Sequence, residues 1–144
     1  MFKQKIFVIS FIVLVLIAVF NYLGMKFNLY WFYRWYDIPM HMLGGFWVTL
    51  FSLSIYSHFS KSFPVISYYV KFLYIMLFIL LAVTISWEVF ELAGGITFVD
   101  DRGYWIDTFA DILNAYIGGA VVYFLFIKNN KNEKILVTEK FNNN

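Results

Sequence analysis

The chain contains no cysteine and little charge, and both absences narrow what it can do. Without cysteine it forms no disulfide bond and offers no thiolate ligand to a metal, and the redox compartment stays undetermined. Only 14% of the residues are charged, the formal net charge is +2, and the basic residues are scattered. This pattern excludes a basic nucleic-acid-binding surface, so we expect no nucleic-acid partner.

Apolar residues dominate the chain instead. They make up 62% of the 144 residues, and aromatic residues alone make up 24%. The mean hydropathy is +0.71. A soluble domain of this length cannot bury so much apolar surface. We therefore predict an all-α integral membrane protein that forms one small bundle and has no separate soluble module.

The apolar segments predict four transmembrane helices. The first contains residues 6–20, which would also suit a signal peptide, but no small-x-small cleavage pattern follows them. The other spans are expected at about residues 37–57, 72–93 and 105–127, with a loop at 58–71. Residues 1–127 are thus the four-span membrane domain, and residues 128–144 are a polar, basic cytoplasmic tail.

The segment between the first and second spans, residues 25–36, is crowded with aromatic side chains. It contains Tyr30, Trp31, Phe32, Tyr33, Trp35 and Tyr36 around Lys26 and Arg34. Aromatic rings mixed with basic residues are typical of the membrane–water interface. We predict that this interfacial segment lies along the lipid headgroups.

The distribution of lysine and arginine predicts the orientation, because four spans place both termini on one side. The side with the termini would carry Lys3, Lys5, Lys61, Lys71, Lys128, Lys131, Lys134 and Lys140, and the other side Lys26, Arg34 and Arg102. The positive-inside rule then places both termini in the cytoplasm. We expect a multi-pass protein of the plasma (inner) membrane.

The four-span topology places most of the acidic residues and one histidine at about the same depth in the membrane. The second and fourth spans begin at the outer face, and the third ends there. Residues spaced three or four apart share one helix face. Charged side chains are costly in lipid, so these should point inward towards one another. The predicted cluster contains Asp37, His41, Glu88, Glu91, Asp107 and Asp111.

A divalent cation would neutralise such a cluster, because several carboxylates cannot all be ionised and unpaired in one pocket. Oxygen ligands suit Mg²⁺, Ca²⁺ or Mn²⁺, and His41 would also admit Zn²⁺ or Fe²⁺. Asn114 and Arg102 are expected around the six ligands. Proton sharing among the carboxylates is the alternative, and it needs no metal.

Simpler roles stay open for single residues of the cluster. His41 would also serve as a packing residue bonded to Asp37, Glu91 could face headgroup water, and Asp107 could cap the fourth span. Asp111 lies a full turn further in, so it cannot act as a cap. Asn114 suits an interhelical hydrogen bond. Four glycines would let helices approach closely beside the cluster: Gly44, Gly45, Gly118 and Gly119.

The order of these motifs resembles that of the VanZ-like membrane proteins and, more closely, of the YjdF-type inner-membrane proteins. The likeness covers residues 36–123 and rests on Asp37, His41, Gly45, Glu88, Glu91, Trp105, Asp107, Asp111 and Gly118. The VanZ-like pattern has glutamine where this chain has Glu91, and a basic residue closer to the last motif than Arg102. The resemblance implies a small multi-pass bundle and, for some VanZ-like members, a part in glycopeptide-antibiotic resistance, but no agreed reaction.

Three classes of function remain open. An enzyme would use a metal-activated water, a carboxylate or His41 as base on a membrane lipid or lipid-linked headgroup. The sequence shows neither a Ser/His/Asp arrangement nor a phosphate-cradling glycine loop. Cation or proton transport would use the shared carboxylates as a relay, but the inner halves of the spans hold almost no polar residues to complete a path. A non-catalytic scaffold or partner subunit would use the cluster only to fix helix register.

Overall fold

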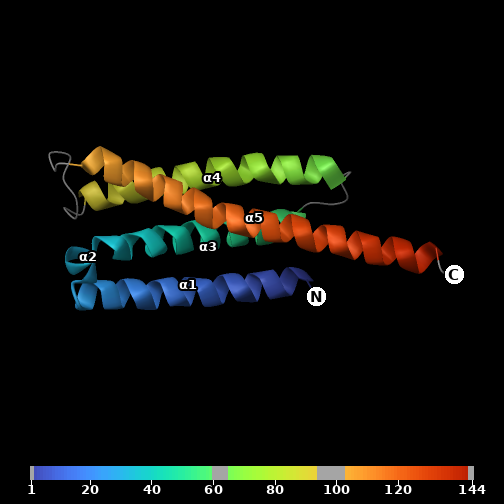
Figure 1. Cartoon of the computed structure of the whole chain (residues 1–144), viewed down its shortest axis with the longest axis horizontal. Helices are drawn as coiled ribbons and strands as arrows, with labels where there is room; N and C mark the ends of the chain where they lie inside the picture. The colour runs from blue at the N-terminus through green and yellow to red at the C-terminus, as the bar shows by residue number, and fades with distance from the viewer. Residues whose placement is uncertain (1, 60–64, 94–102, 143–144) are drawn as a thin grey trace.

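The computed structural model of the chain describes residues 2–59, 65–93 and 103–142, and these are helical almost throughout (Figure 1). The elements are α1 (Phe2–Lys26), α2 (Leu29–Phe32), the 3-10 helix η1 (Arg34–Tyr36), α3 (Asp37–Phe59), α4 (Val65–Ala93) and α5 (Tyr104–Asn142). No strand occurs within the described ranges. Four helices, α1, α3, α4 and α5, are long and apolar enough to cross a membrane. The predicted all-α, four-span fold is therefore confirmed.

Two helices extend beyond their predicted limits. α4 begins at Val65, so the second half of the loop predicted at residues 58–71 is helical. α5 continues through the predicted tail to Asn142, although the apolar run of the sequence ends before Lys128. The division at residue 127 between a membrane domain and a cytoplasmic tail stays a prediction.

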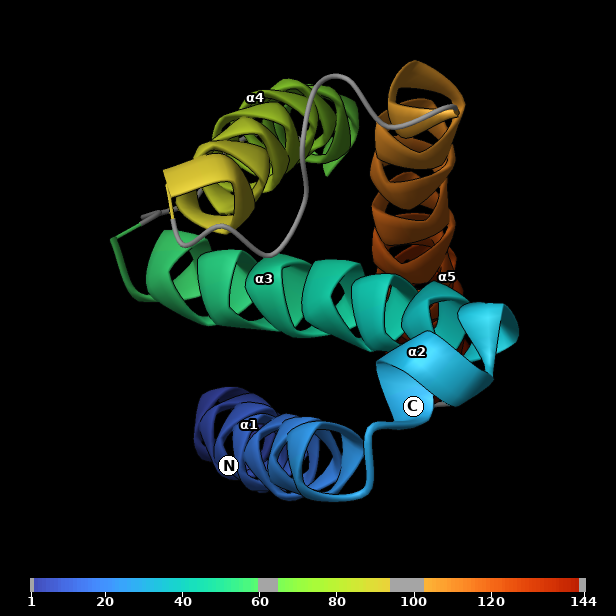
Figure 2. The same cartoon turned by 90° about the vertical axis from the view of Figure 1, so that its left-hand side faces the viewer.

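α3 lies in the middle of the bundle. Figure 2 shows α1 on one side of α3 and α4 and α5 on the other. The most extensive packing joins α3 to α5, which crosses it at an angle. Both termini lie at the end opposite α2 (Figure 1). Buried apolar side chains from all four long helices form the core: Ile6, Val48, Leu50, Leu53, Phe72, Met76, Leu80 and Val122.

A tight corner joins α1 to α3 through α2 and η1. Asn28 adopts the left-handed conformation (φ 54°), which asparagine tolerates better than most residues. Its carbonyl accepts hydrogen bonds from the amides of Trp31 and Phe32, which starts α2. Trp31, Phe32 and Trp35 are 64%, 75% and 62% exposed. This corner is the aromatic segment expected from the sequence, and its place among the headgroups stays a prediction.

Candidate functional site

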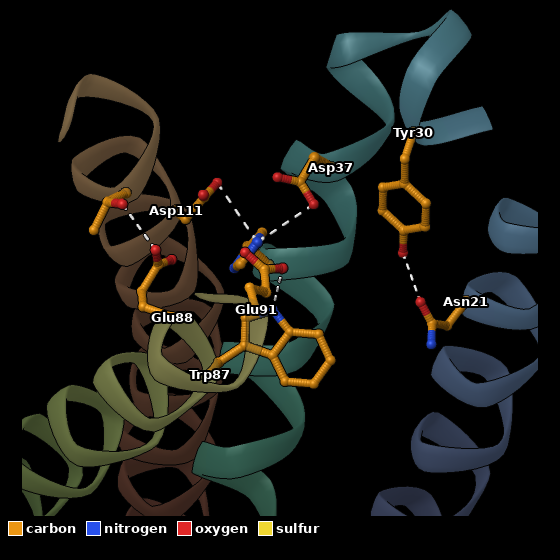
Figure 3. Close-up of polar contacts among 9 residues, drawn as sticks. Asn21, Tyr30, Asp37, Trp87, Glu88, Glu91 and Asp111 are labelled. Carbon is orange, nitrogen blue, oxygen red and sulfur yellow. Dashed lines mark hydrogen bonds and ion pairs between the residues drawn. The ribbon is translucent and has the colours of Figure 1, made fainter. Parts of the chain in front are cut away.

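His41 lies between two carboxylates at the α2 end of the bundle. Asp37 and His41 occupy the first two turns of α3, and their i,i+4 spacing puts both on one face. The Nε2 atom of His41 is 3.3 Å from Oδ1 of Asp37 and 3.6 Å from Oδ1 of Asp111 on α5. Figure 3 shows Asp37 and Asp111 on two helices, with their dashed lines converging on the space between them. The predicted meeting of these three residues is thus present in the structure.

The start of α5 sets the depth of Asp111. Gly103 adopts a positive φ of 99°, and its carbonyl accepts hydrogen bonds from the amides of Ile106 and Asp107. Glycine carries no Cβ, so it enters this conformation without strain. α5 then begins at Tyr104, and Asp111 falls in its second turn on the side that faces α3. The site therefore joins the start of α3 to the interior of α5.

Close backbone contact between α3 and α5 brings the two sides of the site together. Gly45 is one turn beyond His41, and Ala115 is one turn beyond Asp111. A Cβ on Gly45 would overlap the carbonyl of Ala115, and one on Gly118 would overlap the carbonyl of Met42. Small residues allow this approach, as the sequence predicted. Gly119 also faces close neighbours, the side chains of Leu80 and Thr49, whereas a Cβ on Gly44 would meet nothing within 4 Å.

The three side chains differ in exposure. His41 and Asp111 are 10% and 9% exposed, and Asp37 is 30% exposed. Asp37 therefore forms the open edge of the site, and Asp111 forms its floor. A carboxylate as enclosed as Asp111 is costly unless an opposite charge or hydrogen-bond donors compensate it.

The spacing of the ligand atoms suits a metal ion. One atom from each of Asp37, His41 and Asp111 lies within 4.8 Å of the other two. Ligands bound at about 2.0–2.2 Å to a tetrahedral ion lie ~3.3–3.6 Å apart. The two separations from Nε2 of His41, 3.3 Å and 3.6 Å, fall in this range. These three residues could therefore hold a small divalent cation after only slight closure of the carboxylates.

The two glutamates of α4 have their own hydrogen-bond donors. Glu88 is buried, and its Oε2 accepts a 2.8 Å hydrogen bond from the hydroxyl of Thr108 on α5. Oε1 of Glu91 accepts a 2.8 Å hydrogen bond from the indole of Trp87, one turn earlier on α4 (Figure 3). Among the side chains that the structure describes, neither glutamate joins the three-residue ligand group, although Glu91 lies within electrostatic range of Asp37 and His41.

The remaining predicted residues are peripheral or outside the described part. Asp107 is exposed on the first turn of α5. Asn114 is half-buried, and within the described part of the chain no hydrogen bond joins it to Asp37, His41 or Asp111. Arg102 lies outside the described residues.

Sequence reasoning missed the donors around the site. The Trp87–Glu91 bond follows i,i+4 spacing within one helix, so a search for such pairs would have found it. Thr108 and Glu88 lie on different helices, so no spacing could reveal their bond.

Tyr30 of α2 is another neighbour that the sequence did not single out. Its hydroxyl donates a 2.8 Å hydrogen bond to Oδ1 of Asn21 on α1. Burial, and then the charges of Asp37, Tyr36 and Glu91, raise the pKa of Tyr30 to about 12. Tyr30 is therefore a neutral phenol at physiological pH, able to donate a hydrogen bond and not to act as a base.

One comparison with known proteins gave a match. A family model described as a predicted membrane protein (DUF2238) matches residues 2–132, which include all four spans and every residue of the site. Comparisons with curated proteins and with solved structures gave no match. The matching family is not described as VanZ-like or YjdF-type, so that resemblance stays a prediction.

Proposed function

The chain belongs to the DUF2238 family of predicted membrane proteins, and we propose that it binds a divalent cation at Asp37, His41 and Asp111. The observation that carries this proposal is that one atom, Nε2 of His41, faces two carboxylates at 3.3 Å and 3.6 Å. A single N–H cannot serve both acceptors well. A divalent ion bound to a neutral imidazole and two carboxylates has no net charge with its ligands, so it offsets the burial of Asp111.

The ligand chemistry favours a transition-metal ion. One imidazole nitrogen with two carboxylate oxygens suits Zn²⁺, Mn²⁺ or Fe²⁺, whereas Ca²⁺ takes six to eight oxygen ligands. Glu88 and Glu91 already accept hydrogen bonds from Thr108 and Trp87. The two glutamates would therefore lie near the ion without binding it.

Three protein ligands leave coordination positions for water or substrate, as in catalytic zinc sites. The exposed edge at Asp37 lies where α3 begins, at the end of a candidate span. This position supports hydrolysis of a lipid or lipid-linked headgroup, for which a cation held by Asp37, His41 and Asp111 would supply an activated water. By the positive-inside rule, the site opens to the outer leaflet of the plasma membrane, and both termini are cytoplasmic.

Elemental analysis of detergent-purified protein tests cation binding. The wild type should retain near-stoichiometric metal after dialysis and should be stabilised against heat by that ion. His41→Ala and Asp111→Asn should lose both properties. Asp107→Asn is the matched control, because it removes an exposed carboxylate one turn away on the same helix and should retain the metal. Absence of metal, together with no stabilisation by Zn²⁺, Mn²⁺ or Fe²⁺, would contradict the proposal.

A second function would then remain, because the 3.6 Å approach of His41 on α3 to Asp111 on α5 also suits a metal-free pair that shares a proton. Such a network would fix the register of α3 against α5 in a non-catalytic scaffold. Under this alternative, Asp111→Asn would lower the thermal stability of the cation-free protein.

The headgroup reaction has its own test. Metal-loaded protein is incubated with membrane lipids and lipid-linked precursors, and mass spectrometry follows headgroup release. Product should form with the wild type and Asp107→Asn but not with Asp111→Asn. A reaction of equal rate in all three proteins would contradict a metal-dependent enzyme.

A further inference from the structure

The corner between α1 and α3 is fastened to α1 by two tyrosines. The hydroxyl of Tyr36 donates a 2.7 Å hydrogen bond to the carbonyl of Phe20, and that of Tyr30 donates one of 2.8 Å to Asn21, as Figure 3 shows. The rings of Tyr30 and Tyr36 meet edge to face, with centroids 5.1 Å apart. Two hydrogen bonds and one ring pair therefore hold the corner on the last turns of α1.

A buried glycine makes room for both rings. A Cβ on Gly24 would lie 2.6 Å from Cε2 of Tyr30 and 2.8 Å from Cε1 of Tyr36. Real Cβ atoms essentially never come so close to another atom, so a side chain at this position would displace the two rings from where they lie. The tyrosines and Gly24 thus form one packed unit, which we call the tyrosine clamp.

The tyrosine clamp ends next to a proposed ligand. Tyr36 directly precedes Asp37, the first residue of α3. The first turn of a helix lacks intrahelical partners for its N–H groups and frays readily. The 3-10 helix η1 leads directly into α3, and Tyr36 is its last residue. The tyrosine clamp therefore fastens the residue before Asp37 to α1.

The other two ligands need no such support. His41 lies a full turn inside α3, and Asp111 lies in the second turn of α5. Both precede the close contact of Gly45 with Ala115 by one turn. Asp37 is the ligand at a helix end and the most exposed of the three.

We propose that the tyrosine clamp positions Asp37 for the cation and so couples the packing of α1 to the affinity of the site. This inference rests on the cation site proposed above, and Tyr36 acts in it as a positioning residue, not as a ligand. Because coupling is reciprocal, a bound cation should in turn tighten the contact of the corner with α1.

Tyr36→Phe in the full-length, detergent-purified protein tests the coupling. It removes one interhelical hydrogen bond and leaves the three ligands intact. The matched control is Tyr116→Phe, which removes a bond of the same kind, 2.9 Å from the Tyr116 hydroxyl to the carbonyl of Leu77, between α5 and α4. For each protein the dissociation constant of Zn²⁺ and Mn²⁺ is measured by titration calorimetry. Hydrogen exchange of the amides of residues 37–41 is measured without cation.

Tyr36→Phe should weaken cation binding about fivefold, the effect expected from one lost hydrogen bond. It should also speed exchange at residues 37–41. Tyr116→Phe should change neither quantity, even where both variants lose similar thermal stability. Equal affinities in the two variants, or unchanged exchange in Tyr36→Phe, would overturn the coupling while the cation site stands. If the wild type binds neither of these ions nor Fe²⁺, the cation site itself is wrong and the coupling falls with it.

Discussion

Two pairs of carboxylates lie at the same end of this bundle, and their surroundings differ. Glu88 and Glu91 of α4 each accept a 2.8 Å hydrogen bond from a separate neutral donor. Asp37 and Asp111, from α3 and α5, share one imidazole nitrogen at 3.3 Å and 3.6 Å. Each glutamate thus has its own donor, from its own helix or from the next. Among the side chains that the structure describes, the two aspartates share only the imidazole nitrogen of His41.

This difference separates a structural arrangement from a candidate binding site. A buried polar group with its own partner adds stability and specificity to a fold. Two carboxylates around one nitrogen stay under-compensated until a proton or a cation joins them. Acidic residues at one depth are therefore not equivalent, and the variants below test that distinction.

Replacement of Asp111 by Asn should have the largest effect. The variant loses a charged ligand at the floor of the site, so affinity for Zn²⁺ or Mn²⁺ should fall at least ~100-fold, more than the usual effect of a residue outside the ligand set. Calorimetric titration measures this loss. The cation-free variant should be as stable as the wild type or more stable, because one buried charge has gone. A fall in its unfolding temperature would indicate a scaffold role instead.

Gly118→Ala should destabilise the junction between α3 and α5. The added Cβ would overlap the backbone carbonyl of Met42, which cannot move without shifting a helix. Overpacking of this kind costs roughly 2 kcal/mol of the free energy of unfolding, and chemical denaturation in mild detergent measures it. Gly44→Ala is the control, because its Cβ would meet nothing within 4 Å. That substitution should be neutral or stabilise the helix by about 0.5–1 kcal/mol. Equal losses in both variants would contradict the close approach.

Thr108→Val should affect stability and spare the cation. It removes the hydroxyl that donates to Glu88, leaving a buried carboxylate without its donor, and should cost about 1–2 kcal/mol. Affinity for the cation should stay within about twofold of the wild type, an energy difference under ~0.5 kcal/mol. Chemical denaturation measures the free energy of unfolding, and calorimetry on the same preparations measures the affinity for the cation. A large loss of affinity would place Glu88 among the ligands.

Ionisation of Tyr30 should give the smallest effect, confined to alkaline pH. Its pKa is raised from 10.0 to about 12, so the folded protein holds this proton more tightly than the unfolded chain does. The stability that Tyr30 contributes is fully present below pH 10 and is lost as pH rises towards about 12. Ultraviolet titration should show one fewer late-titrating tyrosine in Tyr30→Phe than in the wild type. An equal number in the two proteins would assign the shift to another residue.

Much of the fold could be predicted from the sequence. Span number, order and approximate limits follow from apolar length alone, and the glycines Gly45 and Gly118 mark the true crossing of α3 and α5. Helix ends were predicted less well, because α4 begins at Val65 and α5 runs on to Asn142. Hydropathy predicts the ends of the apolar segment, but a helix can continue beyond that segment.

The site could be predicted only in part. The predicted depth in the membrane brought Asp37, His41 and Asp111 together, as the structure does. α3 and α5 run in the same direction from one face, so the residues of their first turns lie at similar depth. Depth alone could not show that Glu88 and Glu91 lie outside the ligand group. Which side chains face His41 depends on the rotation of each helix about its axis. The tyrosine clamp could not be predicted either, because Gly24 and Tyr36 lie on different helices and come into contact only where the corner folds back on α1.

The most direct test of the central claim is to locate the ion. Anomalous diffraction from crystals grown with Zn²⁺ or Mn²⁺ shows where the metal lies. We predict one anomalous peak about 2.0–2.3 Å from Nε2 of His41 and from a carboxylate oxygen of Asp37 and of Asp111. No peak between these three side chains at saturating metal, with His41 bonded directly to Asp37, would contradict the account.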